Sequence, residues 1–242
     1  MSNELLRALV DLRDRQIQKG RIQFGNRVSA LERGADNGHG PQLLIAEKWA
    51  ERFAQIEVEL DTDIAKEVAN YPIYEYVSEV KGIGPMLAAK MIAMIDIGNS
   101  PTISALWRYS GYAVIDGERE RPVKGEKLHY NKRLKSTLYL IGSSFLKCSS
   151  PYRSIYDSAK EYYVANRTNR QDGEEDWTKL HIHRAAMRKM VKIFLSHLWV
   201  TWRQLEGLPI SMPYVHAKLA HEHYYEPEEF GWTPIASELE IG

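Results

Sequence analysis

The chain has 242 residues, of which 44% are hydrophobic, and its 32 Lys and Arg balance 32 Asp and Glu. This length and hydrophobic content support one large or two small folded domains and exclude a disordered chain. The single cysteine, Cys148, excludes an internal disulfide framework and favours a reducing compartment. The sequence has no secretory signal pattern and no apolar stretch of about 18 residues. We therefore expect a cytoplasmic protein that does not associate with membranes.

Hydrophobic periodicity predicts an all-α protein, a helical bundle with a long helical arm. Leu5, Leu6, Leu9 and Leu12 recur at intervals of three and four residues and predict an amphipathic first helix. A second, longer helix is predicted from 42 to 70, and Tyr71-Pro72 ends it. Its expected apolar side consists of Leu44, Trp49, Phe53, Ile56, Leu60 and Ile64. This helix suits a coiled-coil-like arm and is our candidate surface for a homo-oligomer.

The remaining pattern is also helical. A helical pair is predicted over 74–95, followed by helices over 102–109, 131–146, from 149–151 through Tyr163, and 177–205. Residues 115–127 have no core pattern and predict an exposed loop or a small hairpin.

The neutral total charge conceals an uneven distribution along the chain. Residues 107–170 contain 13 Lys and Arg against 6 Asp and Glu, whereas residues 222–240 contain 6 Glu and no Lys or Arg. A basic middle beside an acidic end favours a phosphate-binding surface with a separate tail, although ordinary solvated faces also show such asymmetry. We therefore divide the chain into N-terminal helices with an arm (1–72), a nucleic-acid-binding domain (73–206) and an acidic, aromatic tail (207–242).

A Gly-Ile-Gly-Pro turn at 82–85 separates two apolar-periodic segments and predicts a helix-hairpin-helix motif. Gly82 and Gly84 are expected to supply positive φ angles, and Pro85 suits the first position of the second helix. Backbone N–H groups at that helix start would then face a phosphate oxygen. The residues expected at this phosphate site are Lys81, Gly82, Ile83, Gly84, Met86, Leu87 and Lys90. The alternative is an ordinary corner between two helices.

Two clusters of cations are further candidates for contact with nucleic acid. Lys and Arg neutralise phosphates, and Tyr can stack on exposed bases. The first cluster consists of Lys124, Lys127, Tyr130, Asn131, Lys132, Arg133 and Lys135. On the last helix, Arg184, Arg188 and Lys192 recur every four residues and form one stripe, of which we assign Arg184 and Arg188 to the interface. The alternative for both clusters is a solvated face.

Metal and catalytic sites have little support in the sequence. The histidines at 181, 183, 216, 221 and 223 lack the Cys pairs and the His-Glu-x-x-His spacing of zinc sites. Serines near 143 and 149 suit helix surfaces and helix caps. We assign no metal ligand and no catalytic residue. We expect no cofactor apart from a monovalent cation, which hairpins of this type can hold through turn carbonyls.

Five short segments stand in a recognisable order between residues 51 and 205. They are Gly82-Ile83-Gly84-Pro85 with Ala88-Ala89, Leu106-Trp107-Arg108-Tyr109-Ser110-Gly111-Tyr112, Tyr130-Asn131-Lys132-Arg133-Leu134-Lys135, Ser150-Pro151-Tyr152-Arg153 and Ala185-Ala186-Met187-Arg188-Lys189-Met190. Together they resemble the C-terminal domain of the Piv-type invertases and RNA-guided insertion-sequence transposases. The resemblance implies a helical arm, a helix-hairpin-helix and the handling of DNA in transposition and recombination.

The chain also departs from this family. The family has a RuvC-like nuclease domain that binds divalent metal, and the residues before the hairpin lack the alternating-strand pattern of such a domain. The family also places a nucleophilic serine in a loop that corresponds to residues 112–130, where this chain has none. We therefore expect a DNA-binding protein that grips the phosphate backbone without cutting it. The alternatives are an active recombinase subunit, a structural or regulatory interaction protein, and structured RNA as the ligand in place of DNA.

Overall fold

The computed structural model describes residues 3–34, 40–115, 118–119, 124–125, 127–168, 175–210 and 225–234. Its elements are α1 (Glu4–Leu12), the π-helical turn η1 (Arg13–Ile17), α2 (Gln18–Glu32), α3 (Gly40–Val68), α4 (Pro72–Glu79), α5 (Pro85–Met94), α6 (Ile103–Tyr109), β1 (Val114–Ile115), β2 (Glu118–Arg119), α7 (Lys132–Lys147), α8 (Arg153–Arg167), α9 (Lys179–Leu205) and the 3₁₀ turn η2 (Pro227–Phe230). The protein is mostly helical, which confirms the predicted all-α class. Strands β1 and β2 form a short antiparallel pair within the segment that was predicted as a loop or small hairpin.

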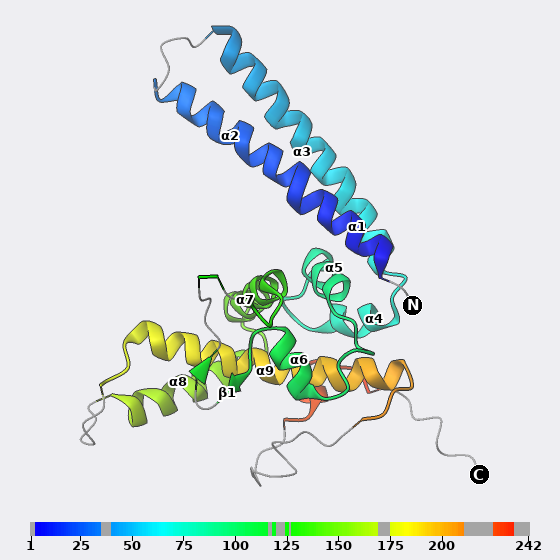
Figure 1. The fold of residues 1–242 in the computed structure, drawn as a ribbon, viewed down its shortest axis with the longest axis vertical. Helices are drawn as coiled ribbons and strands as arrows, with labels where there is room; N and C mark the ends of the chain where they lie inside the picture. The colour runs from blue at the N-terminus through cyan, green and yellow to red at the C-terminus, as the bar shows by residue number, and fades with distance from the viewer. Residues whose placement is uncertain are drawn as a thin grey trace.

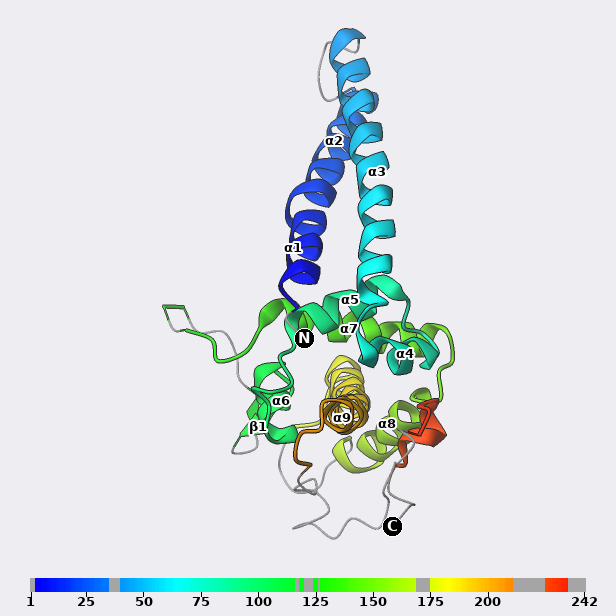
Figure 2. The ribbon, with the colours of Figure 1, turned by 90° about the vertical axis from the view of Figure 1, so that its right-hand side faces the viewer.

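An arm of two antiparallel helical rods projects from the body of the protein (Figures 1 and 2). One rod is α1, η1 and α2 in succession, and the other is α3. Leu31 and Ala46 are buried in the outer part of the arm, and Leu6, Val10, Ile64 and Val68 at its base belong to the core of the body. Two helices alone can bury only one strip of each other's surface. The predicted apolar side of α3 is therefore wrong for Leu44, Trp49 and Ile56, which remain 68%, 45% and 39% exposed.

Helix α9 forms the centre of the body, where Figure 2 shows it end-on with α6, α7 and α8 around it. Trp199 is fully buried, and its indole Nε1 donates a hydrogen bond to the carbonyl oxygen of Ser100 at 2.7 Å. Gly142 of α7 lies so close to α9 that a Cβ there would be 2.7 Å from the sulfur of Met187. This glycine allows α7 and α9 to cross at short range, which sets the geometry of the cleft described below.

The segment 225–234 packs into the same core through Phe230 and Trp232, which are 4% and 3% exposed. Trp232 Nε1 donates to the hydroxyl of Tyr152 at 2.8 Å, and this hydroxyl lies 2.6 Å from His197 Nδ1. His197 Nε2 lies 2.9 Å from the carbonyl oxygen of Tyr225, which can only accept, so Nε2 carries the proton and Nδ1 accepts from Tyr152. Burial lowers the pKa of His197 to about 4, although the bond to Tyr225 opposes this shift. Hydrophobic periodicity did not predict this packing.

Candidate nucleic-acid interface

The hairpin turn between α4 and α5 uses one glycine with a positive φ angle, not two. Gly82 has φ +107°, and a Cβ there would lie 2.8 Å from Cys148 Sγ. Gly84 has φ −88° and ψ 171°, an extended conformation that any residue adopts, so the expectation of a positive φ at Gly84 was wrong. A Cβ at Gly84 would meet no atom of the described residues within 4 Å. The turn therefore needs glycine at 82 for conformation, whereas position 84 is open.

The start of α5 offers backbone donors beside this open position. Pro85 occupies the first helical position, so Met86 and Leu87 carry the N–H groups of the first turn, which have no acceptor inside the helix. Lys81 is exposed nearby. Ile83, in contrast, is 6% exposed, and its N–H donates to the carbonyl oxygen of Val80 at 3.1 Å. Of the seven residues predicted at this turn, Ile83 therefore contributes to the core and offers no free donor.

The hairpin turn is attached to the C-terminal end of α7. Ser144 Oγ donates to the carbonyl oxygen of Gly82 at 2.7 Å, and Cys148 Sγ lies 3.6 Å from the carbonyl oxygen of Lys81. Protein donors thus already contact two of the turn carbonyls. The expectation of a monovalent cation at these oxygens stays a prediction.

Helix α7 presents a polar face that connects the turn to the basic segment. Positions 132, 136, 139, 143 and 147 lie on one face of the helix because they are spaced by three and four residues. Lys132 and Lys147 are exposed at its two ends, and Tyr139 is 49% exposed between them. The 16 residues of α7 span ~24 Å. Sequence reasoning missed Tyr139 and Lys147, although the same helical spacing counted from Lys132 would have found both.

Asn131 begins this helix. Its side-chain oxygen accepts from the N–H groups of Arg133 and Leu134 at 3.0 and 3.1 Å, which makes it the N-cap. Its amide Nδ2 donates to the hydroxyl of Tyr109 at 3.1 Å. Asn131 was predicted to contact nucleic acid, but both ends of its side chain contact the protein. It positions the neighbouring cations.

A cleft of about 450 Å³ lies between α7 and α9 and brings both predicted cation clusters together. Lys135 comes from α7, and Arg184 and Arg188 come from α9. The cleft is lined by Gly111, Tyr112, Lys135, Ser136, Tyr139, Leu140, Arg184, Met187 and Arg188. The ammonium of Lys135 lies 4.2 Å above the ring of Tyr130, so this predicted aromatic residue supports a cation of the cleft.

Burial shifts the pKa values of two side chains near Arg188, Tyr112 and Lys192. It raises the pKa of Tyr112 well above the ordinary value, while the positive charge of Arg188 acts in the opposite direction. It also lowers the pKa of Lys192, and the positive charge of Arg188 adds to that shift. The ammonium of Lys192 lies 3.8 Å above the ring of Trp107. The predicted stripe on α9 thus runs from exposed Arg184 to largely buried Lys192, and only its first part faces the cleft.

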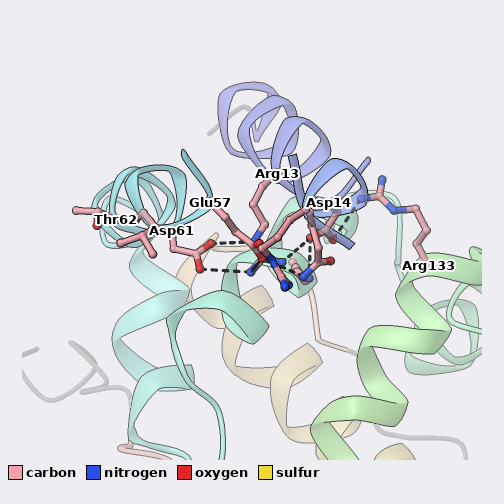
Figure 3. A network of polar contacts seen from close by, with 10 residues as sticks. Arg13, Asp14, Glu57, Asp61, Thr62 and Arg133 are labelled. Carbon is pink, nitrogen blue, oxygen red and sulfur yellow. Dashed lines mark hydrogen bonds and ion pairs between the residues drawn. The ribbon is translucent and has the colours of Figure 1, made fainter. Parts of the chain in front are cut away.

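Two predicted cations, Lys90 and Arg133, attach the arm to the body, and Figure 3 shows Arg133 next to the arm. Lys90 Nζ lies 2.8 Å from Asp14 Oδ1, and Arg133 forms an ion pair with Asp11. Beside them, buried Arg13 pairs with Glu57 at 2.7 Å and with Asp61 at 2.8 Å. Carboxylates of the arm therefore balance the charges of Lys90 and Arg133, which sequence reasoning had assigned to phosphate. No local pattern indicated these acidic partners because Asp11 and Asp14 are distant from both cations in the sequence.

Two predicted cations, the serine of the family-like segment and the possible metal ligands are not part of the cleft lining. Lys124 and Lys127 are exposed. Ser110 is fully buried and donates to the carbonyl oxygen of Trp107 at 3.2 Å, a poor position for a nucleophile. Among the described residues, no group of three or more His, Cys, Asp or Glu side chains could hold a metal ion. The histidines at 216, 221 and 223 lie outside the described residues.

Comparisons of the chain with protein-family models, curated proteins and solved structures find no match. Within the described part of the chain, no helix combines the length and the apolar character needed to cross a membrane. The hairpin turn, the polar face of α7 and the cleft between α7 and α9 form one surface, which is the candidate interface.

Proposed function

We propose that the protein binds nucleic acid, with DNA as the expected ligand, along the surface that runs from the hairpin turn over α7 to the cleft. The observation that carries the proposal is the cleft itself. Three cations from two helices, Lys135, Arg184 and Arg188, line one hollow together with an exposed tyrosine. Cations beside exposed aromatic rings suit a ligand with phosphates and flat bases.

The hairpin turn supports the proposal from the other end of α7. The N–H groups of Met86 and Leu87 lie at the positive end of a helix dipole, and the space beside Gly84 is open in the described structure. Lys147 and Lys81 are exposed where α7 meets the turn. A strand that follows α7 would meet cations or backbone donors at both ends of a path of ~24 Å.

The proposal includes a relationship to insertion-sequence transposases and a cytoplasmic location. The first is supported by the ordered segments between residues 51 and 205, and the second by a single unpaired cysteine. The protein would then position nucleic acid without itself breaking a phosphodiester bond. Because Ser110 is buried, it is poorly placed to act as a nucleophile, which favours binding without cleavage over the alternative of an active recombinase.

The salt dependence of binding tests the proposal. Each phosphate contact contributes about 0.9 to the slope of log affinity against log salt on duplex DNA. Replacing Lys132, Lys135 and Arg184 together with Ala should flatten this slope by roughly two to three units, measured by fluorescence anisotropy on labelled DNA and RNA. The matched control replaces three exposed cations of the arm, Lys19, Lys48 and Arg52, and should leave the slope unchanged. Equal slopes for both variants, or no binding to any probe, would overturn the proposal.

A second candidate function is assembly through the arm. Leu44, Ile45, Trp49 and Ile56 of α3 are exposed by 39% to 68%. Apolar side chains this exposed favour a partner surface, and a second copy of the arm is the occupant that we propose. Sedimentation velocity should find a dimer that Trp49→Lys converts to a monomer. A wild-type protein that is monomeric at all concentrations would contradict this assembly.

A further inference from the structure

The cleft between α7 and α9 is larger and more apolar than phosphate contacts require. Its volume of about 450 Å³ falls within the range of about 300 to 1,000 Å³ that is typical of pockets for small organic ligands. A phosphate needs only donors on an open surface. A cleft of this volume has room for an organic group of the ligand as well as for its phosphates.

The lining of the cleft indicates what kind of group this is. Tyr112 and Tyr139 supply aromatic surface, and Leu140 and Met187 supply apolar surface, while Lys135, Arg184 and Arg188 supply positive charge. A flat aromatic group attached to a phosphate matches both parts of this lining. A nucleobase on its sugar-phosphate backbone is such a group.

From this lining and volume we infer that the cleft receives the base of an unpaired nucleotide, whose neighbouring phosphates contact Lys135, Arg184 and Arg188. The inference rests on the proposed function and specifies the ligand further. A base in a continuous duplex is stacked and paired, so it cannot enter a cleft between two helices. The protein should therefore prefer a bulged, mismatched or single-stranded site to a continuous duplex of the same length.

The side chains that would hold the base are well placed for this role. Tyr139 and Leu140 are 49% and 52% exposed, so they form the accessible part of the cleft. Tyr112 is 6% exposed and lies on the buried side of the cleft, where burial raises its pKa further above the ordinary value. Gly111 has φ +74°, and a Cβ there would lie 2.8 Å from Tyr130 and 3.0 Å from Lys135. This glycine allows the side chain of Lys135 to lie against the segment that carries Tyr112.

The test compares two labelled DNA duplexes that differ only by one unpaired, bulged nucleotide. Because a base that stacks on an aromatic side chain adds to the affinity, the bulged duplex should bind about tenfold more tightly at the same salt concentration. Tyr139→Ala should weaken binding of the bulged duplex about tenfold more than binding of the continuous duplex, whereas Tyr139→Phe should retain the preference. Tyr162→Ala removes a tyrosine of similar exposure from α8, outside the cleft, and should have no effect.

The outcomes separate this inference from the proposed function. Equal affinity for both duplexes, or an equal loss on both with Tyr139→Ala, would refute the base-binding cleft while the protein remains a backbone-binding protein. If neither these duplexes nor the DNA and RNA probes of the salt titration bind, the inference and the proposed function both fail. Because Tyr139 is half exposed, its replacement should not unfold the protein, and circular dichroism of each variant checks this.

Discussion

The hairpin turn allows a substitution that should change stability and nucleic-acid affinity in opposite directions. Gly84 is the N-cap of α5, its backbone is extended, and the space around a Cβ there is open in the described structure. Gly84→Ser adds a hydroxyl where N-cap side chains accept hydrogen bonds from the first helical turn. The donors within reach are the N–H groups of Met86 and Leu87, which are the groups that we expect a phosphate to use.

The size of both effects follows from this geometry. Replacing a glycine at a position that is unstrained for other residues stabilises a protein by about 0.4 to 1 kcal/mol, through the entropy of the unfolded chain. A better N-cap adds a few tenths of a kcal/mol. We therefore expect Gly84→Ser to increase the free energy of unfolding by about 0.5 to 1 kcal/mol. Loss of a hydrogen bond to a charged phosphate costs about 1.5 to 3 kcal/mol, so affinity should fall by at least about tenfold.

Urea unfolding and fluorescence anisotropy on the same preparations measure the two effects. Gly82→Ser is the matched control, because Gly82 has φ +107° and a Cβ there would lie 2.8 Å from Cys148 Sγ. That variant should lower the free energy of unfolding by about 1 to 3 kcal/mol. If Gly84→Ser is more stable and binds with unchanged affinity, the hairpin is only a corner between helices. If it is less stable, our account of the helix N-cap is wrong.

Two further predictions concern stability. Burial lowers the pKa of His197 from 6.5 to about 4, so between these values the unfolded chain binds a proton that the folded protein excludes. The free energy of unfolding, measured by urea titration, should therefore be at its full value above pH 6.5 and fall by about 3 kcal/mol as the pH approaches 4. His197→Gln should reduce this pH dependence. If the free energy of unfolding falls equally with pH in both proteins, His197 is not its source. Glu57→Ala should lower the free energy of unfolding by about 3 kcal/mol, because it leaves buried Arg13 without one of its carboxylates. Replacing exposed Glu59 in Glu59→Ala should lower it by less than about 0.5 kcal/mol. Equal losses for the two glutamates would show that the network at the base of the arm is not stabilising.

Local sequence was sufficient to predict most helices and their ends. Pro72 and Pro85 each stand at the first position of a helix, and Asn131 caps the next basic helix with its own side chain. These signals act between residues a few positions apart, so they are readable without the rest of the fold. The same holds for the spacing that places Arg184 and Arg188 on one face of α9. Helical periodicity alone therefore determined the class of the fold and the candidate cations.

Tertiary structure decided which of those cations share a site. Lys135 and Arg184 meet in one cleft because Gly142 lets α7 and α9 cross closely, whereas Lys90 and Arg133 meet carboxylates of the arm. Both arrangements join residues more than 40 positions apart, and helical periodicity carries no information about such distant partners. The same reason explains why Leu44, Trp49 and Ile56 of the arm remain exposed: an apolar side becomes a core only where a second surface covers it, and the two-helix arm provides that cover along one strip.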